Sequence, residues 1–483
     1  MSCVLKPEYA LIDGVLRPDV VVSVDRSGMI TDVEFGADTR TMRPIDPFAT
    51  DTHRVIPKVQ RLRGKVLLPG FVNTHSHAFQ RLLRGRTEFR AAGHDQDDFW
   101  SWRRAMYRAA NAVSPDDLET VSAFAFVEML RAGFTHVGEF HYLHHQPGGA
   151  RYDDPIELTT RVLAAAQRAG IGISLLRVAY QRAGFGKSFV REQLRFVDTD
   201  LDEYARALEA TEAYARPDDR CPARVGVAAH SVRALDREWL TGLAELAGER
   251  PIHAHVSEQP LEVEECLFEH GMRPVELLSD VGLLSERFTA IHATHVDAQE
   301  VSLLGGARAN ACICPTTEQN LGDGLPNLAA LVAAGVPLSI GTDSHAHIDP
   351  FAELRGLEHG ERLRTRSRNV LARGDGHRNG VAGALIEAGT RGGARALGLL
   401  AGEIATGQRA DLITLDLNDP AVAAVSEGEN GLHALLAAIA LGGGAHLVKD
   451  VWVGGQHVVS DGIHVRWETA VRDYAEAAAQ IWG

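Results

Sequence analysis

The chain has few cysteines, and they follow no disulfide pattern. Its 483 residues include five, which are Cys3, Cys221, Cys266, Cys312 and Cys314. An odd number at scattered positions argues against the disulfide framework of small secreted domains. Cys312 and Cys314 lie inside an apolar segment, which favours buried thiols over a metal site.

Long apolar runs and clusters of basic residues are missing as well. No apolar segment is long enough to span a membrane, and residues 1–6 do not begin a signal peptide. The 49 Lys and Arg residues are outnumbered by 64 Asp and Glu, which gives a net charge of −15. Nucleic acid is therefore an unsuitable partner, because no basic run is available to neutralise its phosphates. We expect a cytoplasmic protein with no membrane or nucleic-acid partner, in which an anionic substrate depends on local arginines.

The middle of the chain repeats a pattern of strands and helices. From residue 66 to about residue 404, short apolar segments alternate with longer amphipathic stretches. The expected strands are Val66–Phe71, Phe134–Phe140, Gly172–Val178, Val225–Ala229, Ile252–Val256, Thr289–His292, Ala311–Cys314 and Pro337–Thr342. The expected helices between them include Pro115–Arg131, Ile156–Ala169, Leu201–Ala215, Asp236–Ala247, Pro260–Glu269 and Leu328–Ala334. Eight such units are typical of a (β/α)₈ barrel.

The two ends of the chain have a different pattern. Residues 1–65 and 405–483 contain short β segments separated by turn signals, and the second region ends in a helical stretch, Glu468–Ile481. The sequence therefore predicts an α/β fold with a distorted (β/α)₈ TIM-type barrel over residues 66–404. The N- and C-terminal segments are expected to form one small β-sandwich domain beside it.

Residues able to bind a metal end several of the expected strands. They are His75 and His77 after the first strand, His255 in the fifth, His292 in the sixth and Asp343 after the eighth. Two histidines spaced by two positions lie on the same face of a strand. Catalytic groups of such barrels lie at the C-terminal ends of the strands, so these residues are expected to meet. Three imidazoles and one carboxylate suit zinc or a similar divalent ion. No lysine occurs in the fourth expected strand, so we expect one metal rather than two bridged by a carbamylated lysine.

Most of these residues also have a simpler explanation. His253 shares a strand face with His255, and His295 lies close to His292, so the sequence alone leaves both choices open. We prefer His255 and His292 because they stand nearer the ends of their strands. Asp343 could instead cap the following segment. The occurrence of such residues at four separate strand ends makes chance the poorer explanation.

The same constellation predicts hydrolysis. A bound metal lowers the pKa of its water toward neutrality, and Asp343 and His292 can hold and deprotonate that water. Glu258, three residues after His255, can carry a proton to a leaving nitrogen, although an acid at this place also suits the start of a helix. An amidine or imine nitrogen leaves as ammonia only when it is protonated, which gives the carboxylic acid a defined task.

These motifs resemble those of the amidohydrolase superfamily in its deaminase branch, and within that branch the formimidoylglutamate deiminases of histidine degradation. The likeness covers nearly the whole chain. Its most specific stretches are His75–Arg81, Phe99–Arg103, Gly138–Tyr142, His230–Arg233, Cys314–Gly324 and Gly341–His345.

The resemblance implies hydrolysis of N-formimino-L-glutamate to N-formyl-L-glutamate and ammonia by a homodimer. It assigns one divalent ion, with zinc expected, to His75, His77, His255 and Asp343, and it assigns proton transfer to Glu258 and His292. It places the formimino group on Gln80 and the two substrate carboxylates on Arg103, Tyr142, His230 and Arg233. Arginine suits this task because its planar guanidinium binds a carboxylate through two parallel hydrogen bonds. The alternatives are salt bridges for the two arginines and simple packing for Tyr142.

Two other functions stay open at this point. A related deaminase acting on a purine or nucleoside ring would need stacking residues, and Phe99, Trp100 and Trp102 are candidates. A non-catalytic barrel that serves as a scaffold would usually have lost metal ligands, and this chain keeps all of them.

Overall fold

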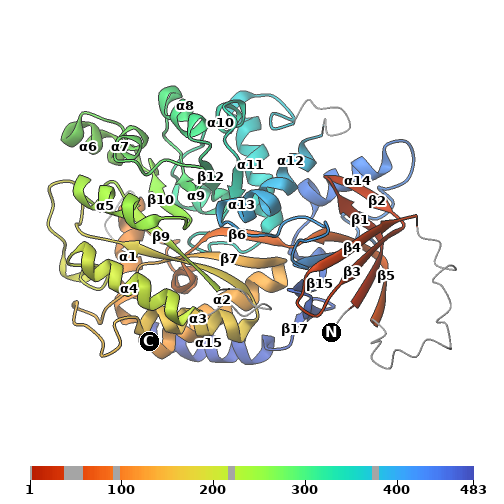
Figure 1. Ribbon diagram of the computed structural model, residues 1–483, viewed down its shortest axis with the longest axis horizontal. Coiled ribbons are helices and arrows are strands. Elements are labelled where there is room, and N and C mark those ends of the chain that lie inside the picture. The colour runs from red at the N-terminus through yellow and green to blue at the C-terminus, as the bar shows by residue number, and fades with distance from the viewer. Residues whose placement is uncertain (1–2, 37–57, 91–97, 216–222, 373–379) are drawn as a thin grey trace.

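The computed structural model describes residues 3–36, 58–90, 98–215, 223–372 and 380–483, and Figure 1 shows how its sheets and helices are arranged. One sheet has eight strands that follow the order of the chain, and every neighbouring pair is parallel. Its strands are β6 (Phe71–Ser76), β7 (Phe134–His141), β8 (Gly172–Ala179), β9 (Ala223–Ser231), β10 (Ile252–Val256), β11 (Phe288–His292), β12 (Asn310–Ile313) and β13 (Leu338–Ile340). The prediction of a (β/α)₈ barrel is confirmed.

Hydrogen bonds between the first and last strands close this barrel. The backbone N–H groups of Thr342 and Asp343 both donate to the carbonyl of His75, at 3.1 and 3.0 Å. The side chain of Asn73 donates to Thr342 Oγ1 at 2.7 Å and accepts from the Thr342 N–H at 3.0 Å. The closing seam therefore lies at two of the expected metal ligands.

Helices cover the outside of the barrel. They are α1 (Phe99–Ala112), α2 (Pro115–Ala132), α3 (Glu157–Ala169), α4 (Leu201–Tyr214), α5 (Arg237–Ala247), α6 (Pro260–His270), α7 (Pro274–Asp280), α8 (Ala298–Gly306), α9 (Pro315–Leu321), α10 (Leu328–Ala333), α11 (Pro350–Thr365), α12 (Val381–Glu387) and α13 (Gly393–Ala396). The six expected helices between strands agree with these bounds to within one residue at each end. Local signals explain the agreement: Ser114 and Asp117 cap the start of α2 reciprocally, and Gly133, at φ 101°, ends it.

The second sheet combines both ends of the chain, as expected for the small β domain. Its main path has the order β17-β16-β15-β14-β5-β1-β3-β4, with β2 paired to β1. The bounds are β1 (Cys3–Ile12), β2 (Val15–Pro18), β3 (Val20–Val24), β4 (Ile30–Phe35), β5 (Lys58–Pro69), β14 (Leu412–Asp416), β15 (Val448–Val453), β16 (Gln456–Ser460) and β17 (Ile463–His464).

The prediction that Val66–Phe71 forms the first barrel strand is wrong. Residues 66–69 belong to β5 and pair with β1 and β14 in the small sheet, whereas the barrel begins at Phe71. The change occurs at Gly70, whose N–H donates to the carbonyl of Asp411 at 2.8 Å, while the N–H of Phe71 donates to Gly133 at 3.0 Å. A Cβ at Gly70 would lie 2.3 Å from the Thr135 side chain. An unbroken apolar run hides this boundary because both strands are buried.

The C-terminal segment also packs on the barrel. Helix α15 (Trp467–Trp482), where Glu468–Ile481 was expected, runs beside α2 (Figure 1). The rings of Tyr474 and Phe124 stack with centroids 4.3 Å apart, and the Arg131 guanidinium lies 3.8 Å from the Trp467 ring. Helix α14 (Gly431–Gly442) contacts α11 and α12. The small sheet and the barrel are thus joined through both strands and helices.

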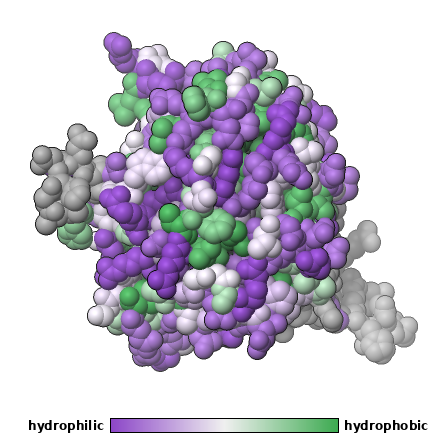
Figure 2. Space-filling view, turned by 90° about the vertical axis from the view of Figure 1, so that its left-hand side faces the viewer, coloured by the Kyte–Doolittle hydropathy of each residue, from purple (hydrophilic) through white to green (hydrophobic). Residues whose placement is uncertain are grey.

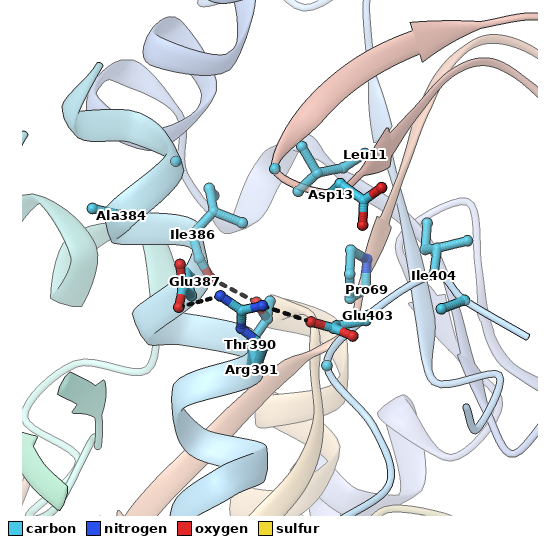
Figure 3. A pocket seen from close by; sticks show the side chains of 14 residues that line it. Leu11, Asp13, Pro69, Ala384, Ile386, Glu387, Thr390, Arg391, Glu403 and Ile404 are labelled. Carbon is cyan, nitrogen blue, oxygen red and sulfur yellow. Dashed lines mark hydrogen bonds and ion pairs between the residues drawn. The ribbon is translucent and has the colours of Figure 1, made fainter. Parts of the chain in front are cut away.

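A pocket of about 100 Å³ lies where the small sheet meets the barrel helices (Figure 3). Its walls include the turn at Asp13, Pro69 and the loop at Glu403. Arg391 spans the pocket and forms ion pairs with Glu387 at 2.5 Å and Glu403 at 3.0 Å. None of the candidate site residues lines this pocket, so it belongs to the junction of the two sheets.

One face of the molecule is chiefly hydrophilic. Figure 2 shows mostly polar side chains on the face that includes α6, with separate apolar areas among them. Phe268 of α6 is the most exposed large apolar side chain in the described part of the chain, at 94%. Among the helices that the structure describes, none is long and apolar enough to cross a membrane.

A buried ion pair between barrel strand β8 and the segment before α4 gives a testable stability prediction. Arg177 of β8 bonds Asp198 at 2.6 and 3.2 Å, and their side chains are 3% and 0% exposed. Arg177→Met would leave the Asp198 carboxylate buried without its cation. We expect the free energy of unfolding to fall by about 3–5 kcal/mol in urea denaturation.

The matched control is the exposed pair of Arg308 and Glu286, whose side chains are 72% and 53% exposed. Glu286→Gln should change the free energy of unfolding by less than about 1 kcal/mol. Equal losses of unfolding free energy in the two variants would contradict the prediction that the buried pair of Arg177 and Asp198 contributes more to stability than the exposed pair.

Candidate active site

Four side chains from the ends of three strands converge on one buried point. They are His75 and His77 from β6 and the residue after it, His255 from β10, and Asp343 just after β13. Nε2 of His75 and Nε2 of His77 lie 3.3 and 3.2 Å from Asp343 Oδ1. The two Nε2 atoms of His255 and His75 are 3.2 Å apart. All four ligand atoms lie within 4.8 Å of one another, so the structure brings the expected ligand set together.

The hydrogen bonds behind these side chains suit metal binding. Nδ1 of His77 bonds the carbonyl of Phe140 at 3.0 Å, and Nδ1 of His255 bonds the carbonyl of His230 at 2.8 Å. A carbonyl only accepts, so Nδ1 carries the proton and each Nε2 directs a lone pair at the common point.

The charges at this point also fit a cation. Burial lowers the pKa of His75 to about 3 and keeps that of His255 well below its ordinary value. Burial works to raise the pKa of Asp343, but the close approach of His75 and His77 holds that pKa well below its ordinary value. Neutral imidazoles and an ionised carboxylate that face one another so closely suit a divalent ion between them.

Several residues in and around the site have a strained backbone conformation. Ser257, His292 and Asp343 adopt the left-handed conformation, with φ of 51°, 68° and 43°. Such a conformation costs a non-glycine residue about 1–3 kcal/mol and concentrates at functional sites. Hydrogen bonds support it here, since the Ser257 N–H donates to Glu262 Oε1 at 2.9 Å and the Asp343 N–H to His75.

Glu258 and His292 lie beside the four ligands. His292 Nε2 is 3.7 Å from Glu258 Oε1 and 3.8 Å from Asp343 Oδ2. Burial raises the pKa of Glu258, although the nearby His292 opposes this shift. Burial also opposes the charged form of His292, but the Glu258 and Glu318 carboxylates outweigh it and raise that pKa. A carboxylic acid and an imidazole thus stand where protons would be exchanged.

The structure separates the alternatives that the sequence left open. His253 is fully buried and its Nε2 faces the carbonyl of Ala396 at 3.2 Å, and His295 Nε2 bonds the carbonyl of Asp323 at 2.9 Å. Neither belongs to the ligand group. Asp343 and Glu258 are not helix caps: Asp349 caps α11, and the acid in the first turn of α6 is Glu262.

Gln80, Tyr142 and His230 surround the ligand group. Gln80, in the 3₁₀ helix Ala78–Leu83, donates to Tyr142 Oη at 2.9 Å, and its Oε1 is buried without a partner among the described residues. The Tyr142 ring lies 5.1 Å from that of His77, and the His230 ring lies 5.0 Å from that of His255. Tyr142 therefore does more than pack, because its hydroxyl orients the Gln80 amide.

The two arginines extend the site away from the ligand group. Arg103 of α1 donates to Tyr180 Oη at 3.2 Å, and the Tyr180 ring lies 4.8 Å from the ring of His230. Arg233 follows β9, is 8% exposed and donates to the carbonyl of Ala183 at 3.1 Å. Within the described part of the chain, neither arginine forms an ion pair. The salt-bridge alternative is therefore absent there, and both cations are available to an anion.

Two buried carboxyl groups near the site had no assigned role in the sequence analysis. Glu318 of α9 lies 3.2 Å from His292 Nδ1, and burial raises the pKa of Asp323 to about 9. His292, Cys314 and Glu318 also form a second group of close potential ligands. The available signal was the position of Glu318 in the first turn of a helix that follows a barrel strand. Only the fold shows that this turn adjoins β11.

Comparisons with known proteins agree with this geometry. Residues 66–458 match the model of the Amidohydrolase family. The chain is 41% identical, over 87% of its length and 90% of the relative, to a formimidoylglutamate deiminase from Pseudomonas aeruginosa. An amidohydrolase from Brucella melitensis has a TM-score of 0.87 and 35% identity, with full coverage of both chains. A zinc-bound adenosine deaminase from Xanthomonas campestris has a TM-score of 0.79 and 24% identity, over 99% of this chain and 98% of that one, which supports the fold.

The family model covers well over half of the chain, and a relative above 30% identity covers most of it. The protein therefore belongs to the amidohydrolase family.

Proposed function

We propose that this protein hydrolyses N-formimino-L-glutamate to N-formyl-L-glutamate and ammonia, as a step of histidine degradation. The observation that carries the proposal is a buried metal-ligand group with an acid, Glu258, on one side and two arginines without ion pairs beyond it. The 41% identity to a formimidoylglutamate deiminase supports the same conclusion.

The reaction breaks a carbon–nitrogen bond after water has added to the formimino carbon. A divalent ion held by His75, His77, His255 and Asp343 would activate the attacking water. Asp343 and His292, whose Oδ2 and Nε2 are 3.8 Å apart, take the proton from that water. Glu258 gives a proton to the amino group that this addition forms, the bond between carbon and that nitrogen breaks, and the nitrogen departs as ammonia. The second proton of the water leaves the new carbonyl oxygen to the Asp343 carboxylate, and both water protons thus reach the released ammonia in the complete cycle.

The substrate's own charges explain the rest of the site. N-Formimino-L-glutamate carries two carboxylates, and the net charge of −15 makes the surrounding field unfavourable for it. Arg103 and Arg233 supply the positive charge, with Tyr142 and His230 as further hydrogen-bonding partners. Gln80 binds the formimino group, because its Oε1 is an acceptor without a partner in the described residues.

Three further features are part of the proposal. We expect one ion per subunit, most simply zinc, since three imidazoles and a carboxylate suit it and an adenosine deaminase of the same fold binds zinc. A homodimer and a cytoplasmic location stay predictions.

The direct test is release of ammonia from N-formimino-L-glutamate, with metal quantified in the same sample. We expect turnover of this substrate, about one ion per chain, and much slower release from guanine or adenosine. Turnover of a purine without formiminoglutamate would establish the alternative, a ring deaminase. A protein that binds no metal and cannot be reconstituted would instead indicate a scaffold.

Glu258→Gln should lower kcat by about 10²–10⁴-fold, because the amide cannot deliver a proton. Metal content should be unchanged, since Glu258 is outside the ligand group. The control is Glu264→Gln on the exposed side of α6, which should keep normal turnover. Near-normal kcat in Glu258→Gln would remove this residue from the mechanism.

Arg233→Met should mainly raise KM, by about 10- to 100-fold, because charged hydrogen bonds to a substrate carboxylate are lost. Steady-state kinetics with N-formimino-L-glutamate measures the effect. Arg237→Met, which removes an exposed arginine of α5 paired with Asp280, is the matched control. An unchanged KM in Arg233→Met would exclude the proposed carboxylate contact.

A further inference from the structure

The central histidines differ in what holds their second ring nitrogen. Nδ1 of His77 and of His255 bonds a backbone carbonyl. Nδ1 of His292 instead lies 3.2 Å from a carboxylate oxygen, Oε1 of Glu318. A carbonyl suits a neutral metal ligand, whereas a carboxylate makes a stronger, charged partner for an imidazole that exchanges protons. The mechanism proposed above gives Glu318 no task.

The Glu318 carboxylate is itself held in place. Its side chain is 3% exposed, and Oε1 also accepts the Cys314 N–H at 2.9 Å. The neighbouring Thr317 hydroxyl bonds the carbonyl of Thr342 at 3.3 Å and Ser344 Oγ at 3.1 Å. The first turn of α9 is thus tied both to His292 and to the segment that carries Asp343.

The contact with Glu318 orients the His292 ring. His292 stands at a strand end in left-handed backbone, and its Nε2 has no hydrogen-bond partner among the described residues. The contact with Glu318 holds Nδ1 on the Glu318 side of the ring, so Nε2 faces Glu258 and Asp343. Without Glu318, rotation of the ring would turn Nε2 away from the reaction centre.

We propose that Glu318 is a positioning residue that acts through His292, fixing the orientation of its ring so that Nε2 faces Glu258 and Asp343 and exchanges protons with the reaction centre. This inference rests on the proposed function for its kinetic consequences, while the contact itself is independent of the substrate. The alternative for the same group, a second metal bound by His292, Cys314 and Glu318, becomes an outcome of the test.

A double-mutant cycle tests the proposal. Glu318→Ala should lower kcat for N-formimino-L-glutamate by about 10- to 100-fold, with KM and metal content unchanged. In a His292→Gln background, assayed under single-turnover conditions, the same Glu318 change should alter the rate by less than about twofold. Glu318→Gln, which keeps an oxygen near Nδ1, should recover part of the loss. Equal losses in both backgrounds would indicate a merely structural role and overturn the proposal.

Glu361 offers a matched control. It is also a buried carboxylate that accepts a backbone N–H at the start of a helix, that of Leu328 at 2.7 Å, and it is remote from His292 in its contacts. Glu361→Ala should lower the melting temperature comparably but leave kcat unchanged.

A second readout does not depend on turnover. In protein labelled with ¹⁵N-histidine, the His292 Nδ1–H held by Glu318 should give a downfield proton resonance that disappears in Glu318→Ala and His292→Gln and persists in Glu361→Ala. If this pattern appears but formiminoglutamate is not hydrolysed, the proposed function fails and the positioning role stands. If the signal survives Glu318→Ala, or if that variant loses a second metal ion, the positioning role is wrong.

Discussion

The pairing of β6 with the chain after β13 is the interaction on which the rest of the site depends. Asn73 and Thr342 are separated by 269 positions, yet two hydrogen bonds join them, and the N–H groups of Thr342 and Asp343 share the carbonyl of His75. Because these bonds are made by ligand residues or by residues one or two positions away, the contacts that close the barrel also place Asp343 beside His75. The strained backbone at Asp343 persists because this seam fixes its surroundings.

The placement of charges in the site explains how a protein with a negative net charge could bind the acidic substrate that we propose. Near the reaction centre, carboxyl groups face local partners: Asp343 faces His75 and His77, and Glu318 faces His292. Farther out, Arg103 and Arg233 form no ion pair with the residues that the structure describes. An anion would therefore meet the arginines first, while its formimino end enters the buried centre. In our proposal, the substrate is oriented by the position of the arginines relative to the metal ligands and not by the net charge of the protein.

The sequence predicted the features that depend on short-range patterns. Strand ends identified His75, His77, His255 and Asp343, and local caps gave helix bounds to within one residue. The sequence did not predict the features that depend on contacts between distant segments of the chain. The apolar run at residues 66–71 does not reveal that Gly70 divides two sheets, since burial on both sides removes the alternation that would mark a boundary. The place of Glu318 in the first turn of α9 did not reveal its role, because its partner His292 lies 26 positions away at the end of β11.

The fold alone does not select a substrate. An adenosine deaminase shares it with a TM-score of 0.79 at 24% identity, so the shared barrel does not by itself identify the substrate. The residues to which we assign substrate selection lie outside the strands: Gln80 in a 3₁₀ helix, Arg103 on α1 and Arg233 after β9. Their chemistry favours a flexible diacid. Arg103 and Arg233 each donate a hydrogen bond to a neutral group but have no anionic partner in the described chain, and a neutral purine would leave these charges unbalanced. With a dicarboxylate bound, each gains the partner that the protein itself does not provide.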